Sequence, residues 1–368
     1  MFNYKSNSFK HNLILLFVLF ALSCKDLSKD QSQLDSTTSS SGDLSSNAII
    51  NSTLDELRSK IKEQNLDYAV DITSVAGKTI DEITGEKELT KAQNDSIQGL
   101  LLHKNDIDKN ATSDYIVVNG KQLLPTMSRL DLRDYGLITS IKDQNPAGSC
   151  WAFGAMSAFE SNYNIVNSLK IDASEQYVIN CSGAGTANNG GLAFQVFQWM
   201  IDKGKNVDDE ASSPYEANDL PCRSTQINTN YYAVEWQFID PSQNPSVIPT
   251  VQQIKDAICK YGAISASVYV SSDFQYYKFR SSEPTKSYIF KENRTFSGTN
   301  HAISLIGWDD SKNAWILKNS WGTGWGITCS QQGEAAEYRK ENAGYMWIDY
   351  NTNNIGRRAL WVRARKTK

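Results

Sequence analysis

The sequence predicts a protein of the α+β class, in which a helical part precedes a part rich in strands. Ser149 is a suitable N-cap for the run at residues 150–163, which predicts a helix. Far downstream, residues 301–308 and 315–318 form two apolar stretches typical of buried strands. The chain has 368 residues, of which 40% are hydrophobic and 21% charged, so it can bury a sizeable core.

Composition excludes some classes of function. The net charge of −4 leaves no basic surface to meet phosphates, so we expect no nucleic-acid partner. The six cysteines and three histidines form neither a CxxC pair nor an HExxH motif. We therefore expect no metal site and no cofactor.

Residues 1–24 predict an export signal. Lys5 and Lys10 precede a ten-residue apolar run at residues 13–22, which is too short to span a bilayer. The run ends in small residues followed by Cys24, which resembles a bacterial lipobox. We expect Cys24 to carry lipid and to hold an exported protein on the membrane at the cell envelope or surface. An ordinary cleaved secretory signal is the alternative.

The region that follows divides into two parts. Residues 25–52 are mostly polar and predict a flexible tether. Residues 53–124 are predicted to be partly structured. Their pattern indicates helices near residues 54–62 and 89–102 and strands near residues 68–72 and 115–118, the last bounded by an Asn119-Gly120 turn.

Cys150 is the first candidate for chemistry. It would lie in the first turn of the predicted helix, where the positive end of the helix dipole favours thiolate over thiol. A thiolate nucleophile needs a nearby imidazole to take its proton. His301, at the start of an apolar strand, is the only histidine after position 103.

Asn319 is the candidate partner of that histidine. It follows the second apolar strand, where its amide could accept a hydrogen bond from the imidazole and fix the tautomer. Trp321 and Trp325 could shelter this hydrogen bond from water, although tryptophans are more often core residues.

Five segments, in this order, resemble the landmark motifs of the papain (C1) family of cysteine peptidases. They are residues 144–153, 174–176, 189–191, 300–307 and 319–326, within a region of about residues 129–365. The resemblance implies a papain-like two-lobe fold over residues 125–368. A mainly helical lobe would extend from about Gly148 to Tyr232, and a β-barrel-like lobe would carry His301 and Asn319. The active site would occupy the cleft between the lobes.

The resemblance also implies an activity and the residues for it. Cys150, His301 and Asn319 would cleave peptide bonds of a peptide or protein substrate through a thioester, and Gln144 would stabilise the oxyanion. The substrate would bind along a further set of residues, namely Gly190, Gly191, Leu192, Ala193, Ser267, Ala302 and Trp321. Two alternatives remain open: a catalytically silent surface lipoprotein that binds a partner, and a transpeptidase that passes the acyl group to an amine.

The cysteines predict two disulfides. The resemblance pairs Cys181 with Cys222, and elimination then pairs Cys259 with Cys329. Cys259 could equally be a buried free thiol, because it lies on a probable helix.

The resemblance gives residues 53–124 two possible roles. They are either a pro-segment that covers the cleft, running through it in the reverse direction, or a permanently attached accessory region. The usual helical signature of such pro-segments is not found in them.

Overall fold

The computed structural model describes residues 41–107, 114–223, 227–280, 282–283, 285–327 and 343–367. These residues belong to one unit of the chain, Ser40–Lys368. The predicted signal, Cys24, the tether up to residue 40 and Cys329 lie outside the described residues. What the sequence predicts for these residues remains a prediction. No described helix is both long and apolar enough to cross a bilayer.

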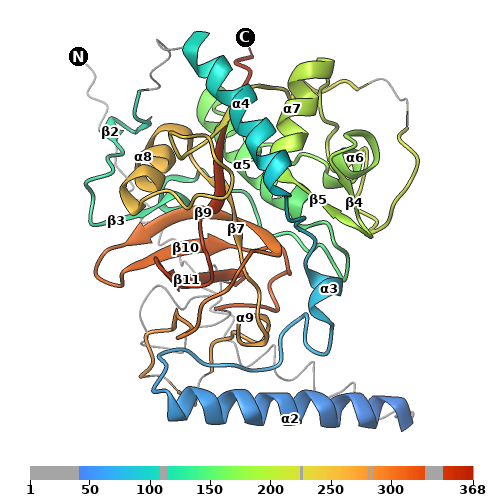
Figure 1. Ribbon diagram of the computed structural model, residues 1–368, viewed down its shortest axis with the longest axis vertical. Coiled ribbons are helices and arrows are strands. Elements are labelled where there is room, and N and C mark those ends of the chain that lie inside the picture. Colours follow the sequence, from blue (N-terminus) through green and yellow to red (C-terminus); the bar gives the residue numbers. More distant parts are fainter. Residues whose placement is uncertain are drawn as a thin grey trace, which may run out of the picture. The chain divides into compact units, whose positions relative to one another are not determined.

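The helical lobe consists of α5 (Cys150–Asn167), α6 (Glu175–Cys181) and α7 (Ala193–Lys203), within the predicted limits (Figure 1). Helix α5 is buried along most of its length, and Gly154 on it lies against Ser265 and Ala302. A helix that is apolar on nearly all sides is stable only inside a core. Here α5 is packed between its own lobe and the sheet.

The second lobe is built on an eight-stranded sheet with the order β6-β12-β7-β9-β10-β11-β8, in which β3 also pairs with β9. Strand β9 is buried throughout and begins at His301. All the pairings are antiparallel except that of β11 with β8. The strands are β3 (Arg129–Asp131), β6 (Ala233–Phe238), β7 (Ile264–Val268), β8 (Ile289–Phe290), β9 (His301–Asp309), β10 (Ala314–Lys318), β11 (Tyr345–Asp349) and β12 (Arg357–Ala364).

Shorter elements complete the two lobes. The 3-10 helix η1 (Leu132–Tyr135) follows β3, and α8 (Val251–Tyr261) and α9 (Ser272–Gln275) flank β7 in the sequence. Strands β4 (Gly185–Thr186) and β5 (Gly190–Gly191) form a small antiparallel pair in the helical lobe.

The N-terminal region contains α2 (Ser41–Glu63), α3 (Ile80–Ile83), α4 (Lys91–Ile107) and the hairpin β1 (Val117–Val118) and β2 (Lys121–Gln122). Both predicted helices and the Asn119-Gly120 turn are confirmed, and both turn residues have positive φ. The strand predicted at residues 68–72 is wrong, because only a single bridge from Val70 to Tyr277 forms there.

The tether prediction is wrong for residues 41–52, which are helical. Leu54, Leu57 and Ile61 bury one face of α2 in the hydrophobic core of the sheet lobe. Once such a face is packed, extending the helix costs little, because nucleation is the expensive step. The polar residues before Leu54 therefore continue the helix as an exposed extension.

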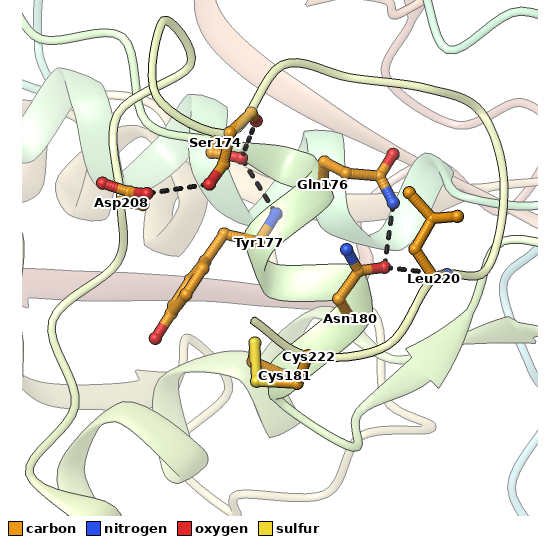
Figure 2. The surroundings of a disulfide bond; sticks show 9 residues. Ser174, Gln176, Tyr177, Asn180, Cys181, Asp208, Leu220 and Cys222 are labelled. Atoms are coloured by element: carbon orange, nitrogen blue, oxygen red, sulfur yellow. Dashed lines mark hydrogen bonds between the residues drawn. A yellow bond between two sulfur atoms is a disulfide. The ribbon is translucent and has the colours of Figure 1, made fainter. Parts of the chain in front are cut away.

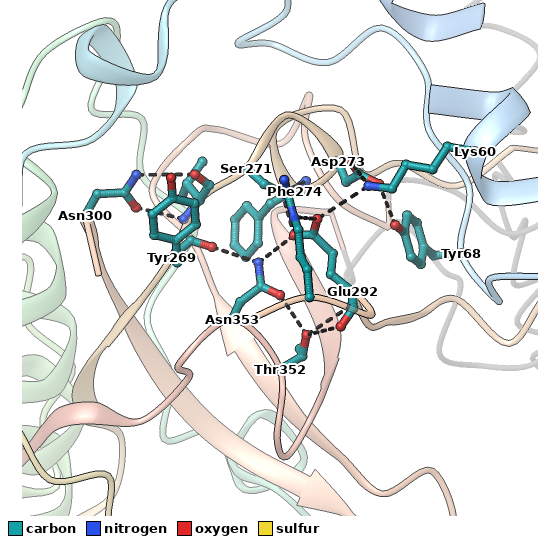
Figure 3. Close-up of polar contacts among 12 residues, drawn as sticks. Lys60, Tyr68, Tyr269, Ser271, Asp273, Phe274, Glu292, Asn300, Thr352 and Asn353 are labelled. Atoms are coloured by element: carbon teal, nitrogen blue, oxygen red, sulfur yellow. Dashed lines mark hydrogen bonds and ion pairs between the residues drawn. The ribbon is translucent and has the colours of Figure 1, made fainter. Parts of the chain in front are cut away.

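Buried polar contacts also hold α2 on the sheet lobe (Figure 3). Lys60 Nζ lies 2.8 Å from Asp273 Oδ1 and 3.6 Å from Glu292 Oε1. Tyr68 donates its hydroxyl to the same Asp273 oxygen at 2.7 Å. Ser271 and Asn353 donate to Glu292 in turn. Both carboxylates thus have hydrogen-bond partners, as buried charges require.

Helix α4 packs on the other lobe. Leu101 belongs to the hydrophobic core of the helical lobe, and Leu89 and Ile97 pack against it. Asn94 also donates to Ser246 Oγ at 2.9 Å, and Gln98 donates to Ser242 O at 2.7 Å, both in the segment between β6 and α8. The N-terminal region is therefore attached to the sheet lobe through α2 and to the helical lobe through α4, as Figure 1 shows.

Cys181 and Cys222 form the disulfide that the family resemblance implied, with Cα atoms 4.8 Å apart (Figure 2). The bridge joins the end of α6 to a loop that is also held by Asn180, whose side chain accepts from Leu220 N. Cys259 is a free thiol, in line with the alternative of a buried free thiol, and the predicted bridge to Cys329 involves a residue outside the described ones. Cys259 is buried in the core on α8, and this burial leaves it as a small apolar side chain.

We expect the double variant Cys181→Ala/Cys222→Ala to unfold with a free energy lower by about 3–4 kcal/mol. The bridge closes a long loop, with a sequence separation of 41, and so restricts the unfolded chain. Urea denaturation without reductant measures the difference. Dithiothreitol should lower the stability of the wild type to that of the variant and leave the variant unchanged. A variant as stable as the wild type would contradict this account.

Candidate active site

Cys150 is the first residue of α5 and is fully buried. Its sulfur accepts a hydrogen bond from Ala302 N at 3.4 Å, so it lies beside the residue that follows His301. Ser149 occupies the N-cap position, but its side chain does not cap the helix. Its hydroxyl instead forms a 2.6 Å hydrogen bond with the hydroxyl of Tyr215.

His301 and Asn319 are joined by a 2.8 Å hydrogen bond between Nε2 and Oδ1. They lie at the start of β9 and directly after β10, two paired strands. An amide oxygen only accepts, so Nε2 carries the hydrogen and Nδ1 is the basic nitrogen. Nδ1 has no hydrogen-bond partner among the described residues. Trp321 covers the imidazole, with ring centroids 4.8 Å apart.

Gln144 lies beside this pair. Its backbone N donates to Ser320 O at 2.7 Å, and its Oε1 accepts from Ser320 Oγ at 2.7 Å. These contacts fix the orientation of the amide, so Nε2 is the donor. Nε2 donates to Ala147 O at 2.7 Å and to Ile83 O at 3.2 Å.

A buried ionic cluster supports the residues around Gln144 and Asn319. Lys142 Nζ pairs with Glu160 at 3.1 Å and with Glu175 at 2.9 Å. Lys318, next to Asn319, donates to Thr139 Oγ1, and burial lowers its pKa to about 8. A buried charge that loses its partner costs several kcal/mol, so this cluster restrains both segments.

Residues 83–88 of the N-terminal region cross directly over these side chains, and we call them the crossing segment. Gly191 N donates to Gly85 O at 2.8 Å, and Lys87 N donates to Gly191 O at 3.1 Å. Glu86 and Gly191 form a parallel bridge. On the opposite side, the backbone N of Gly85 and of Glu86 donates to Asn300 O. The crossing segment thus has backbone partners on both lobes.

Glycines make this crossing possible. A Cβ on Gly85 would lie 2.0 Å from Gly148 O, and one on Gly190 would lie 2.1 Å from Gly85 O. Contacts this short do not occur for real Cβ atoms. At Gly191 a Cβ would meet the indole of Trp151 at 2.7 Å. The backbone of the crossing segment therefore lies against the backbones of residues 148 and 190–191 with no side chain between them.

The remaining predicted substrate residues occupy two places. Ser267, Ala302 and Trp321 contact the site: Ser267 donates to Glu86, Ala302 to Cys150, and Trp321 Nε1 to Ile83 O at 3.1 Å. Leu192 and Ala193 lead from β5 into α7 and are buried in the core of the helical lobe.

Sequence reasoning missed Thr299 and Arg358, whose side chains contact Glu86. The pair of arginines in the otherwise apolar stretch at residues 355–362 was the available signal.

Burial determines the charge state of the site. It raises the pKa of Cys150 to about 12, against the opposing effect of the backbone amides of Ala302 and Gly85. It lowers the pKa of His301 to about 4, against the hydrogen bond to Asn319. The sequence-based expectation of a thiolate is therefore wrong for this covered state. The helix dipole stabilises a charge by at most about 2 kcal/mol, which is less than burial of the thiolate costs.

No group of three or more His, Cys, Asp or Glu side chains in the described part of the chain could hold a metal ion. The groups available for chemistry are a buried thiol, an oriented imidazole and an amide donor.

A model of the papain family of cysteine proteases matches residues 126–353. The chain belongs to this papain family. Cys150, His301, Asn319 and Gln144 all lie within the matched residues.

Curated relatives agree with this assignment. Digestive cysteine proteinase 3 of Homarus americanus is 28% identical over 62% of this chain and 64% of its own length. A cathepsin L-like protein of Caenorhabditis elegans is 30% identical over 61% of this chain and 60% of its own. The chain thus spans about three fifths of the length of these relatives.

Solved structures of the papain family share the fold. The bromelain protease from Ananas comosus in complex with the E64 inhibitor is 28% identical, with a TM-score of 0.53 over 65% of this chain and 100% of that chain. A recombinant stem bromelain precursor has a TM-score of 0.64 at 22% identity, over 92% of this chain and 98% of that chain. Residues 126–368 alone would make up less of the chain than the 92% that this precursor structure covers. The likeness in fold therefore extends into the N-terminal region.

We expect acidification to destabilise the chain through His301. Its pKa falls from 6.5 to about 4 on folding, so between these values the unfolded chain binds more protons. The contribution of neutral His301 to the free energy of unfolding is fully present above pH 6.5 and is lost as the pH falls toward 4. At pH 4.5 the loss is about 2 kcal/mol. Urea denaturation at pH 7 and pH 4.5 measures the loss. His301→Gln should show a loss smaller by that amount, and equal losses in both proteins would contradict the assignment.

Proposed function

We propose that this chain is a cysteine peptidase that hydrolyses peptide bonds, with Cys150 as nucleophile, His301 as base and Asn319 as the residue that orients the histidine. One observation carries the proposal. Asn319 binds one nitrogen of the His301 imidazole, the other nitrogen, Nδ1, has no partner among the residues that the structure describes, and the next residue, Ala302, contacts the Cys150 sulfur through its N–H. Family membership supports the same class of activity.

The proposed reaction is acyl transfer. His301 Nδ1 takes the thiol proton, and the sulfur attacks the carbonyl carbon of the substrate. Gln144 Nε2 and the backbone N of Cys150 donate to the oxygen that becomes negative. The imidazolium then protonates the leaving amine, and water releases the acyl group from the thioester. The donation from Gln144 to Ile83 O, a carbonyl of a chain that crosses the site, supports this role.

We further propose that residues 53–124 are a pro-segment that inhibits the peptidase until it is removed. Its crossing segment occupies the backbone partners that a substrate needs at Gly191 and buries Cys150 and His301 completely. It lies parallel to Gly191 at Glu86, in keeping with the reverse direction that the family resemblance implied. Contacts on both lobes through α2 and α4 hold it in place.

Export is part of the proposal. The Cys181–Cys222 disulfide supports an oxidising compartment, where such bridges persist. Removal of residues 1–23 and acylation of Cys24 would then hold the protein at a membrane surface.

We expect Cys150→Ala to abolish hydrolysis of a fluorogenic peptide by the protein after its N-terminal region has been released. Cys259→Ala is the matched control, since Cys259 is also buried, also free, and has its pKa raised to about 12 by burial. The control should keep wild-type kcat/KM. Mass spectrometry of the products distinguishes hydrolysis from transfer to an added amine. Residual activity in Cys150→Ala, or its loss in Cys259→Ala, would rule out Cys150 as the nucleophile.

We expect Gly85→Ala to raise the activity of the uncleaved chain at least about tenfold. A Cβ at this position would meet Gly148 O at 2.0 Å and displace the crossing segment. Gly99→Ala is the control, because a Cβ at Gly99, also in the N-terminal region, meets nothing within 4 Å. Initial rates are measured on protein shown to be intact by mass spectrometry. Full activity of the uncleaved wild type would refute the pro-segment role.

A further inference from the structure

Arg358 is a buried cation in an unusual backbone conformation. Its side chain is only 3% exposed, and its φ is 53°, in the left-handed region that residues other than glycine rarely adopt. It lies on β12 where the pairing with β7 shifts register between Arg357 and Leu360. Such an irregularity changes the direction of a side chain, and backbone strain of this kind is common at functional sites.

Both carboxylates that pair with Arg358 come from the crossing segment. Its guanidinium lies 3.1 Å from Glu86 Oε2 and 2.6 Å from Glu88 Oε2. No other ion pair of Arg358 forms among the described residues, and its Nε has no partner there. When the crossing segment leaves, the peptidase part keeps this cation and loses both counter-charges.

Glu86 enters a site built to hold a carboxylate. Its side chain is 3% exposed, accepts hydrogen bonds from Ser267 Oγ and from Thr299 Oγ1 at 3.1 Å, and forms an ion pair with Arg358. Arg358 also donates to Thr299 Oγ1 at 2.8 Å, which fixes the donors relative to one another. We call this set of residues the glutamate site: Ser267, Thr299 and Arg358.

The glutamate site lies next to the catalytic residues. Ser267 pairs across β7 and β9 with Ala302, whose backbone N contacts the Cys150 sulfur. The backbone of Glu86 is paired with Gly191, the residue proposed to pair with the substrate. A substrate residue paired with Gly191 would therefore direct its side chain to the place that Glu86 now fills.

We propose that Arg358, with Ser267 and Thr299, makes this peptidase selective for substrates that carry an acidic side chain at the residue whose backbone pairs with Gly191. This inference rests on the proposed peptidase function. A glutamate there restores the counter-charge that Arg358 loses with the crossing segment. A basic side chain meets a like charge, and an apolar one leaves a buried cation unpaired, which is costly.

The electrostatics of Glu86 agree with this assignment. Burial raises the pKa of its carboxyl, and Arg358 is the largest opposing influence. Glu88 is different, because its side chain is 46% exposed and it also pairs with Arg357. Of the two glutamates, Glu86 and not Glu88 therefore occupies the position proposed for a substrate side chain.

The test uses the full chain, folded first and then released from its N-terminal region by limited proteolysis. Internally quenched peptides carry Glu, Gln, Leu or Arg, in separate series, at each of the three residues before the scissile bond, and the series that shows a preference identifies the residue paired with Gly191. We expect kcat/KM for Glu to exceed that for Gln at least about tenfold, with Arg the poorest. Gln has nearly the shape of Glu, so this ratio isolates the charge.

Variants then assign the preference to one residue. Arg358→Gln should bring the ratio of Glu to Gln close to one, and Arg358→Lys should restore part of it. Arg363→Gln is the matched control, because Arg363 lies on the same strand and pairs with Glu235, and it should keep the wild-type ratio. The substrate series on the wild type decides the question even if the Arg358 variants do not fold.

The outcomes separate the two proposals. Cleavage that depends on Cys150 but shows no preference for Glu over Gln would overturn the acidic selectivity and leave the peptidase proposal standing. A preference that survives in Arg358→Gln would overturn the role of Arg358. Absence of Cys150-dependent cleavage for every peptide would overturn both.

Discussion

The structure depends on a contact between backbones at Gly85, Gly148 and Gly190. Because none of the three has a side chain, a segment of the N-terminal region can lie directly on the turn before Cys150. The other features of the covered site follow from this closeness. It allows Gly191 N to donate a hydrogen bond to Gly85 O and brings Ile83 O within hydrogen-bonding distance of Gln144 Nε2. It also excludes water from the Cys150 thiol.

Holding a short extended segment in such a place has an entropic cost of about 1–2 kcal/mol for each ordered residue. The crossing segment does not meet this cost alone. Helix α2 buries Leu54, Leu57 and Ile61 in one lobe, and α4 buries Leu101 in the other. The segment is stretched between two independently packed helices. Whether the crossing segment stays on the site therefore depends on the packing of α2 and α4, which lie far from Cys150.

Much of the fold could be predicted from local pattern. The helix after Ser149, the strands that start near His301 and end before Asn319, and the Asn119-Gly120 hairpin all follow from spacing and turn chemistry. Motif order placed Gln144 beside these residues, and the structure brings all four positions together.

What sequence could not give were properties set by distant contacts. Counting cysteines could not decide whether Cys259 is bridged or free, because a count carries no information on burial, and α8 places that thiol in the core. The position of Cys150 at the start of a helix suggested a thiolate, yet burial under the crossing segment raises the pKa of the thiol and keeps it neutral. The pair of arginines at residues 357–358 was a local signal for Arg358, but it carries no information on the register shift between β7 and β12.

The burial of Cys150 has a consequence for chemical lifetime. Peroxides oxidise a thiolate and need access to it, whereas Cys150 has a pKa of about 12 and no exposed surface. In the covered state the sulfur therefore resists conversion to sulfenic and sulfinic acids. Under the proposed export and release of the N-terminal region, uncovering the sulfur would start its reactivity and its oxidation at the same moment, in a compartment where no reductant repairs such damage. The number of bonds one molecule can cut would then be limited by oxidation as well as by substrate supply.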